Sequence, residues 1–224
     1  MTAEGPAGAL PHDLPQDDLP HDDLPHDAIV LAGGRASRLG GASKPDVVVR
    51  GRRMLAHVLD AVPGASSVVV VGPPTLEVPV GVALTLEDPP DGGPVAGIEA
   101  GLAALGDGAL DPAGPERWVL LLACDVPLVA GAVPRLLGAA AERRHDPACD
   151  GVMVVDGAGR EQPLVGLYRA SALASALRGL AAEHHVRGAS VRSLLGGLRL
   201  ARLVDDGAAS CDVDTWEDVR RIDG

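Results

Sequence analysis

The stretch that decides the fold is Ala28–Lys44, which reads AIVLAGGRASRLGGASK. Its first four residues form an apolar run that is long enough for a buried strand and too short for a helix. A glycine-rich loop follows, and glycine amides can approach an anion closely because they have no Cβ atom. Arg38 and Lys44 add positive charge to this loop. The stretch therefore predicts a strand that leads into a loop for the phosphates of a nucleoside triphosphate.

Lys44 is the only lysine in the chain, beside 18 arginines. A glycine-rich surface loop with incidental cations is the alternative interpretation. The general preference for arginine argues against it, because a lysine kept inside such a loop supplies a compact point charge that a planar guanidinium does not. We therefore expect the ammonium of Lys44 to contact phosphate.

The overall composition predicts one globular domain. The chain has 224 residues, and 46% of them are hydrophobic, which is enough for a sizeable core. Seven acidic residues at positions 1–27 contribute to the net charge of −12 and leave −5 for the remainder. This mild charge argues against broad binding to nucleic acids or anionic membranes. The sequence has no membrane-spanning apolar run, no signal peptide and no cysteine pair with zinc or redox spacing, so we expect a cytoplasmic protein.

Residues 1–26 differ from the rest of the chain. A five-residue unit repeats there, and successive copies end in Leu14-Pro15, Leu19-Pro20 and Leu24-Pro25. Frequent proline and low apolar content predict a disordered tail rich in proline, aspartate and histidine. Weak metal binding by its histidines and aspartates is the alternative interpretation. We place the folded domain at residues 27–224.

Strands and helices alternate through this domain. Besides the first strand, apolar runs predict strands at 67–71, 82–86, 118–123, 151–155, 163–168 and 198–204. Helical periodicity predicts helices at 54–62, 95–105, 133–143, 170–182, 190–195 and 215–222. This alternation is typical of a single Rossmann-like α/β domain with three α/β/α layers and a mostly parallel sheet. Ligands of such sheets bind beyond the carboxyl ends of the strands.

Asp125 follows the most apolar of these strands, with only Cys124 between them. A carboxylate in this position faces the ligand crevice and suits Mg²⁺, which binds one or two carboxylates together with phosphate oxygens. An aspartate that caps the following turn is the alternative interpretation. The nearby glycine loop favours the metal ligand. Cys124 is expected to pack as a small hydrophobic residue.

The loop pattern L-A-G-G-x-x-x-R-x-G-G-x-x-K is neither of the two common phosphate loops. It resembles the signature of nucleotidyltransferases with a Rossmann-like sheet, and more narrowly that of molybdenum cofactor guanylyltransferases. Cys124-Asp125-Val126-Pro127 is similar to the family's C-D-x-P, and residues 93–97, GPVAG, are similar to its G-P-L-A-G. The resemblance extends over residues 28–224.

The resemblance implies an enzyme that uses Mg²⁺ to transfer GMP from GTP to molybdopterin, with or without bound molybdenum, and that releases pyrophosphate. It implies catalytic roles for Arg38, Lys44 and Asp125, with Asp125 as metal ligand and Asp214 as a second candidate. The implied nucleotide-binding residues are Leu31, Ala32, Gly33, Gly34, Lys44, Asp88, Gly97 and Asp125. The implied acceptor-binding residues are Gln162, Pro163 and Asp212. Molybdoenzymes or other cofactor-biosynthesis proteins are the expected protein partners.

The chain also departs from the family pattern. Ser43 replaces an aspartate, Gly72 replaces an asparagine, Asp212 and Asp214 replace two asparagines, and Trp216 replaces a proline. The two aspartates are more typical of the cytidylyltransferase branch, so a CTP-using molybdopterin cytidylyltransferase, or another small-phosphate nucleotidyltransferase, is one alternative. A nucleotide-binding regulatory module without catalysis is another, against which the presence of both Lys44 and Asp125 argues. Either Asp214 or Thr215 is expected to cap the last helix.

Overall fold

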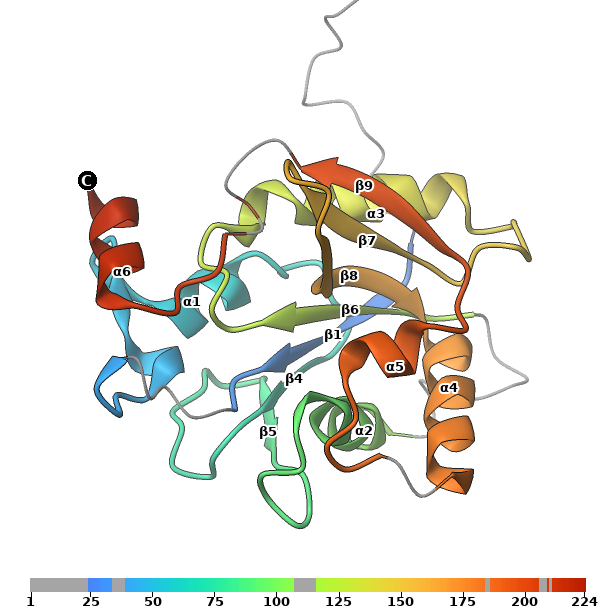
Figure 1. Ribbon diagram of the computed structural model, residues 1–224, viewed down its shortest axis with the longest axis horizontal. Coiled ribbons are helices and arrows are strands. Elements are labelled where there is room, and N and C mark those ends of the chain that lie inside the picture. The colour runs from blue at the N-terminus through green and yellow to red at the C-terminus, as the bar shows by residue number, and fades with distance from the viewer. Residues whose placement is uncertain (1–23, 34–38, 107–115, 184–185, 206–208, 210) are drawn as a thin grey trace, which may run out of the picture.

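The computed structural model describes residues 24–33, 39–106, 116–183, 186–205, 209 and 211–224. Within them, one sheet of seven strands has the order β5-β4-β1-β6-β8-β7-β9 (Figure 1). Its strands are β1 (His26–Leu31), β4 (Val68–Val71), β5 (Ala83–Thr85), β6 (Trp118–Ala123), β7 (Gly151–Asp156), β8 (Glu161–Arg169) and β9 (Leu200–Asp205). All neighbouring pairs are parallel except the two that include β8. The expectation of a mostly parallel sheet is confirmed.

Helices cover both faces of the sheet, because successive strand residues point to opposite faces. In β1, Ala28 and Val30 pack with α1 (Met54–Asp60) and α3 (Val133–Glu142). Ile29, between them, packs with α2 (Pro94–Ala104), α4 (Ala170–Ala182) and α5 (Val191–Leu195). Figure 1 shows α4 and α5 in front of the sheet and α1 and α3 behind it. The three α/β/α layers are those that the sequence predicts.

A two-stranded ribbon lies outside the main sheet, and the sequence analysis does not predict it. β2 (Val48–Val49) pairs with β3 (Arg52–Arg53) in the antiparallel sense. Arg50 and Gly51 join them with φ values of 49° and 74°, as a tight two-residue hairpin turn requires. The ribbon and α6 (Trp216–Asp223) share a small apolar cluster of Leu39, Val47, Val49, Met54, Val213, Val219 and Ile222.

Two glycines let α2 approach the sheet closely. A Cβ atom at Gly101 would lie 2.7 Å from Cγ2 of Ile29, and one at Gly97 would lie 3.3 Å from Cδ2 of Leu31. A larger residue at either position would push the helix away from β1. The close approach places the amino end of α2 beside the carboxyl end of β1, where the candidate site lies.

The folded domain begins slightly earlier than the sequence predicts. Leu24 is only 8% exposed and packs in the core, and β1 starts at His26. Asp27 is 1% exposed and accepts two hydrogen bonds from Arg117, at 2.6 and 2.8 Å. Leu24 and Pro25, which end the last repeat unit, therefore pack with the domain, because Leu24 fills a core position and the carbonyl of Pro25 accepts a hydrogen bond from the amide of Trp118. The remaining tail prediction, for residues 1–23, falls outside the described residues.

Among the described residues, no helix combines the length and apolar character needed to cross a membrane.

Cys124 is 2% exposed, and burial, as the largest influence, raises the pKa of its thiol to about 12. It is therefore a neutral thiol that packs in the core, which confirms the expected packing role.

Candidate active site

A cavity of about 380 Å³ lies beyond the carboxyl ends of β1, β4 and β6. The last residue of each strand, Leu31, Val71 and Ala123, forms part of its wall. The other lining residues are Gly33, Lys44, Glu87, Asp91, Gly93, Pro94, Gly97, Cys124, Asp125 and Leu164. This is the edge at which an α/β sheet binds its ligands, and the volume suits a small-molecule ligand.

Lys44 is the centre of the charged part of the site. Its Nζ atom donates hydrogen bonds to Oδ2 of Asp125 at 2.5 Å and to Oδ1 of Asp214 at 2.6 Å. Burial alone would lower the pKa of Lys44, but the two hydrogen bonds and the two negative charges outweigh burial and raise it to about 12. The side chain is therefore a fixed positive charge at neutral pH.

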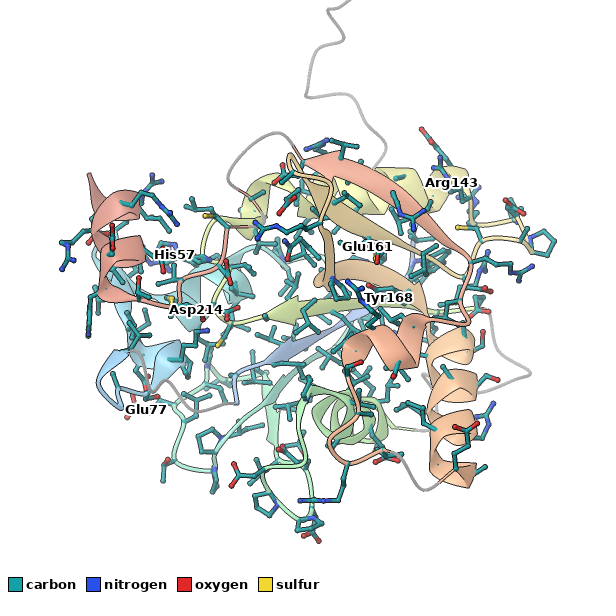
Figure 2. The ribbon with its side chains drawn as sticks, in the orientation of Figure 1. His57, Glu77, Arg143, Glu161, Tyr168 and Asp214 are labelled. Atoms are coloured by element: carbon teal, nitrogen blue, oxygen red, sulfur yellow. The ribbon has the colours of Figure 1, made fainter. Side chains whose placement is uncertain are left out.

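Three separate elements bring these groups together. Lys44 begins the short 3₁₀ helix η2 (Lys44–Asp46), and Asp125 follows β6. The amide of Val213 donates to the carbonyl of Asp125 at 2.8 Å, which fixes the segment that leads into α6. Asp214 lies on this segment, near the carboxyl end of β6 (Figure 2).

Thr215, and not Asp214, caps α6. Its hydroxyl accepts a hydrogen bond from the amide of Asp218 at 3.2 Å, and the Asp218 carboxylate accepts one from the amide of Thr215 at 2.9 Å. This reciprocal pair is a capping box. The side chain of Asp214 is therefore available to Lys44, which settles the two alternatives that the sequence leaves open.

The donor set fits a divalent cation. Asp125 and Asp214 direct one carboxylate oxygen each to the same positive charge beside the cavity. Mg²⁺ is typically bound by one or two carboxylates, with phosphate oxygens and water completing its shell. Among the described residues, no group of three or more His, Cys, Asp or Glu side chains has metal-site geometry. The two carboxylates are thus the candidate ligands in the described part of the chain.

The structure brings together five of the predicted nucleotide-binding residues. Leu31, Gly33, Lys44, Gly97 and Asp125 all line the cavity. The predicted residues Gly34 and Arg38 lie outside the described residues.

Two further predicted residues are placed differently. Ala32 is 2% exposed and lies outside the cavity lining, where its amide donates to the carbonyl of Val71 at 2.8 Å. Asp88 is exposed and also lies outside the lining, whereas Glu87 and Asp91 are part of it. Sequence reasoning missed these two carboxylates, although both lie in the same strand-to-helix loop as Asp88.

The structure shows the surroundings of three residues that depart from the family pattern. The Ser43 hydroxyl donates to the carboxylate of Asp46 at the start of η2. A Cβ atom at Gly72 would lie 3.2 Å from Cδ2 of Leu76 and 3.3 Å from the carbonyl oxygen of Ala32, so the backbone there is tightly packed. Trp216 is the first residue of α6, and its side chain is 47% exposed.

A bulge in β8 separates the cavity from a second hollow. Met153 of β7 faces Gly166, but the next residue, Val154, faces Gln162, so residues 163–165 bulge out of the ladder. Tyr168 is fully buried, and its hydroxyl donates to the carbonyl of Pro163 at 2.8 Å. Burial raises the pKa of Tyr168, so the donor stays protonated. The bulge carries Leu164 to the cavity and Pro163 to the other side.

The predicted acceptor-binding residues lie around this second region. Gln162 and Asp212 line one hollow of about 760 Å³, together with Gly159, Arg160, Glu161, Arg192 and Arg202. Pro163 lines an adjoining hollow that shares Glu161, Arg192 and Arg202 with it. Figure 2 shows Glu161 at the start of β8. Sequence reasoning missed the arginines, because each is an isolated cation with no surrounding motif.

A mostly parallel sheet with a lysine, glycines and two carboxylates at its carboxyl edge is typical of nucleotide-binding α/β proteins. The model of the MobA-like NTP transferase domain matches residues 28–202, and the chain belongs to this family. The members of this family are NTP transferases, which generally use a divalent metal.

The sequence relatives share one name. Over 198 residues the chain is 30% identical to the molybdenum cofactor guanylyltransferase of Cupriavidus pinatubonensis, a match that covers 86% of this chain and 93% of the relative. Over 151 residues it is 34% identical to the enzyme of that name from Rhodopseudomonas palustris. This second match covers 63% of this chain and 64% of the relative, so the chain spans less than two thirds of that relative's length.

A solved structure confirms the fold. The crystal structure of molybdopterin-guanine dinucleotide biosynthesis protein A from Archaeoglobus fulgidus superimposes with a TM-score of 0.64 at 20% sequence identity. The match covers 88% of this chain and 96% of the other.

Proposed function

We propose that this protein transfers GMP from GTP to molybdopterin, releases pyrophosphate and forms the guanine dinucleotide cofactor. The observation that carries the proposal is the contact of Lys44 with Asp125 and Asp214 at the cavity beyond β1 and β6. The choice of GTP and molybdopterin rests on the guanylyltransferase relatives.

Charge neutralisation and positioning supply most of the catalysis in such a reaction. Lys44 holds the triphosphate, and its raised pKa keeps it a fixed charge, so it does not exchange a proton with the substrate. Asp125 and Asp214 would hold Mg²⁺, which when bound neutralises charge that develops on the phosphates. Arg38, which lies outside the described residues, remains the second candidate cation.

The acceptor lies in the second region, across the β8 bulge from the nucleotide. Gln162, Pro163 and Asp212 contact it, and Arg192 and Arg202 attract its negative charge. Its phosphate oxygen forms a bond to the α-phosphorus, while the bond from that phosphorus to the bridging oxygen breaks. The electron pair leaves with pyrophosphate. No general base is needed, because the attacking phosphate is already ionised at neutral pH.

Molybdoenzymes or other cofactor-biosynthesis proteins would take the product. The free thiols of Cys124, Cys149 and Cys211 are in keeping with the reducing cytoplasm as the place of reaction. Asp212 and Asp214, typical of the cytidylyltransferase branch, favour CTP as the second candidate donor.

A pyrophosphate-release assay tests this function. The protein is supplied with Mg²⁺, molybdopterin and one of GTP, CTP, ATP or UTP, and the product is identified by mass. We expect release with GTP and a product heavier than molybdopterin by one GMP unit less water. Faster release with CTP would assign the chain to the cytidylyl branch. Tight nucleotide binding without pyrophosphate release would favour a regulatory module.

The arginines give the acceptor site its own test. Arg192→Ala should raise the KM for molybdopterin about tenfold, through loss of a charge-assisted contact, and leave the KM for GTP unchanged. An unchanged KM for molybdopterin would place the acceptor elsewhere.

A further inference from the structure

Tyr168 is the only tyrosine in a chain that has no phenylalanine. Its side chain is fully buried in β8, and its hydroxyl donates to the carbonyl of Pro163 at 2.8 Å (Figure 2). A buried hydroxyl lowers stability unless it makes a hydrogen bond, whereas a leucine or methionine fills an apolar position without that requirement. A core built almost without aromatic residues therefore keeps a hydroxyl here, where it holds the backbone at Pro163.

Two glycines make room for the ring of Tyr168. A Cβ atom at Gly166 would lie 2.5 Å from the hydroxyl oxygen and 2.7 Å from Cζ, and one at Gly151 would lie 2.7 Å from Cδ1. Gly166 precedes Tyr168 by two residues in β8, so both residues face the same side of the sheet. Gly151 is the residue of β7 that pairs with Tyr168. The ring therefore lies along β8, over Gly166, and brings its hydroxyl back to Pro163.

The carbonyl that accepts this hydrogen bond belongs to the bulge of β8, residues 163–165. Leu164 lines the cavity, whereas Pro163 lines one of the two arginine-lined hollows. Two successive residues of one backbone therefore belong to the walls of both regions. A shift of this backbone would alter both walls at once, and the hydroxyl of Tyr168 holds it in place.

The bulge also lies at the end of β6 that carries the candidate metal ligand. β8 is antiparallel to β6, and Val165 pairs with Leu122. The next residue along each strand, Leu164 in β8 and Ala123 in β6, lines the cavity. Asp125 follows Ala123 by two residues and lines the cavity as well. The bulge is therefore placed between the proposed positions of the triphosphate and of the acceptor.

We propose that Tyr168 is a positioning residue for nucleotidyl transfer. Its hydroxyl fixes the bulge at Pro163 and thereby sets the direction from which the acceptor phosphate approaches the α-phosphorus. Because Tyr168 is fully buried, it acts through the bulge and not by contact with a substrate. Displacement at phosphorus depends on alignment, and a misplacement of about 1 Å can slow a reaction on the order of 100-fold. This inference rests on the proposed function, which assigns the donor to the cavity and the acceptor to the hollows.

Tyr168→Phe tests the role, because it removes the hydrogen bond and keeps the ring. With Mg²⁺, GTP and molybdopterin, the kcat for GMP transfer should fall about tenfold, since the bulge loses the contact that holds it. The Kd for GTP, titrated without molybdopterin, should change less than about twofold. Transfer at the wild-type rate would overturn the proposal. An unchanged kcat with a Kd for GTP raised about tenfold would also overturn it, because the bulge would then serve only the donor.

Val119→Ala is the matched control for stability. Val119 is the residue of β6 that pairs with Tyr168, and it is fully buried and lines neither the cavity nor the hollows. Its truncation leaves a void in the core, so the melting temperature should fall at least as far as in Tyr168→Phe. The kcat of this control should stay within about twofold of the wild type. A kcat that falls in both variants in proportion to their melting temperatures would mean that Tyr168 is only structural, and would overturn the proposal.

Gly166→Ala disturbs the same hydrogen bond from the other side. The new Cβ atom would meet the hydroxyl of Tyr168, so transfer should slow at least as much as in Tyr168→Phe. In the double variant the two losses should not multiply, because each change removes the same contact. Losses that multiply would mean that the hydroxyl acts elsewhere, and would overturn the proposal. Thermal melting shows whether Gly166→Ala folds, and if it does not, Tyr168→Phe decides alone.

The proposed function and the role of Tyr168 fail in different ways. A folded wild type that transfers no GMP from GTP to molybdopterin would refute the proposed function, and the role of Tyr168 with it. A wild type that transfers GMP, beside a Tyr168→Phe variant that is equally fast, would refute the role of Tyr168 alone and support the proposed function.

Discussion

The ammonium of Lys44 lies 2.5 Å from a carboxylate oxygen of Asp125. The contact joins the loop after β1 to the end of β6, two neighbouring parallel strands. The same carboxylate is a candidate ligand of the divalent cation. We therefore expect the contacts of Lys44 to shift from Asp125 to phosphate oxygens when a metal and a triphosphate bind.

Substitution of either partner should stop turnover without unfolding the protein. Lys44→Ala and Asp125→Asn should each slow pyrophosphate release on the order of 10³-fold, through the loss of several kcal/mol of charge stabilisation. Lys44→Arg should also be slow, since a planar fork does not replace a point charge between two carboxylates. Near-normal turnover of Asp125→Asn, with a metal still required, would assign the metal to Asp214. Thermal melting provides the control for folding.

Asp214 and Asp212 should separate into two roles. Asp214→Asn should raise the Mg²⁺ concentration for half-maximal rate about tenfold, because it removes one of two candidate carboxylate ligands. Asp212→Asn should instead change the KM for the acceptor, because Asp212 lines the second hollow. Rates measured across a series of Mg²⁺ concentrations at fixed GTP test which of the two aspartates affects metal binding. A metal requirement that moves only in Asp212→Asn would reverse the assignment.

The tail should be dispensable up to the last repeat unit. Deletion of residues 2–22 should change neither the melting temperature nor turnover, because that segment has too little apolar content for a core. Deletion of residues 2–27 should cost several kcal/mol, on the order of 3–5, because it removes buried Leu24 and leaves Arg117 without Asp27. Urea unfolding of both proteins measures the difference. A large loss in the shorter deletion would show that the tail docks on the domain.

Gly101 and Gly138 should respond oppositely to alanine. Gly101→Ala should destabilise the protein by about 1–3 kcal/mol, because the new Cβ atom meets Ile29 at 2.7 Å. Gly138 of α3 has no atom within 4 Å of such a position, so Gly138→Ala should stabilise by about 0.5–1 kcal/mol. Urea midpoints test the pair. Equal effects would contradict the close packing of α2 on β1.

The stability that the Thr215–Asp218 capping box adds to the protein should depend on pH. The hydrogen bond from Thr215 is the main reason that the pKa of Asp218 lies below its ordinary value of 3.8. A depressed carboxylate pKa adds stability that is present above the ordinary value and is lost as the pH falls through the folded-state value. Thr215→Ala should therefore cost about 1 kcal/mol at pH 7 and less at pH 3. Urea unfolding at both pH values, with exposed Thr75→Ala as control, measures this; a constant cost would contradict it.

The sequence predicts the layers well where a segment's own pattern decides its structure. The strand at 118–123 and the helix at 170–182 have the bounds found in the structure, because continuous burial and helical periodicity are local properties. The ribbon of β2 and β3 was missed, because two-residue strands are too short to show a period. The direction of β8 also follows from tertiary pairing and not from its composition.

In the candidate site, too, the residues that local patterns mark were predictable and those placed by tertiary packing were not. Lys44 and Asp125 were predictable because each follows an apolar strand, and strand ends fix a position in an α/β sheet. The presence of Glu87 and Asp91 in the cavity lining, with Asp88 outside it, was not predictable, because tertiary packing sets the exposure of side chains in this loop.

The antiparallel strand β8 lies between two hollowed regions of the sheet that different strands form. The nucleotide cavity lies beyond β4, β1 and β6, whereas the arginine-lined hollows lie beside β7, β8 and β9. If the proposed acceptor site is correct, substitutions around these hollows should alter which phosphate compound accepts the nucleotide and leave the contacts of Lys44 with Asp125 and Asp214 intact. On the proposed function, replacing β7, β8 and β9 by those of another nucleotidyltransferase should then change the dinucleotide that is formed.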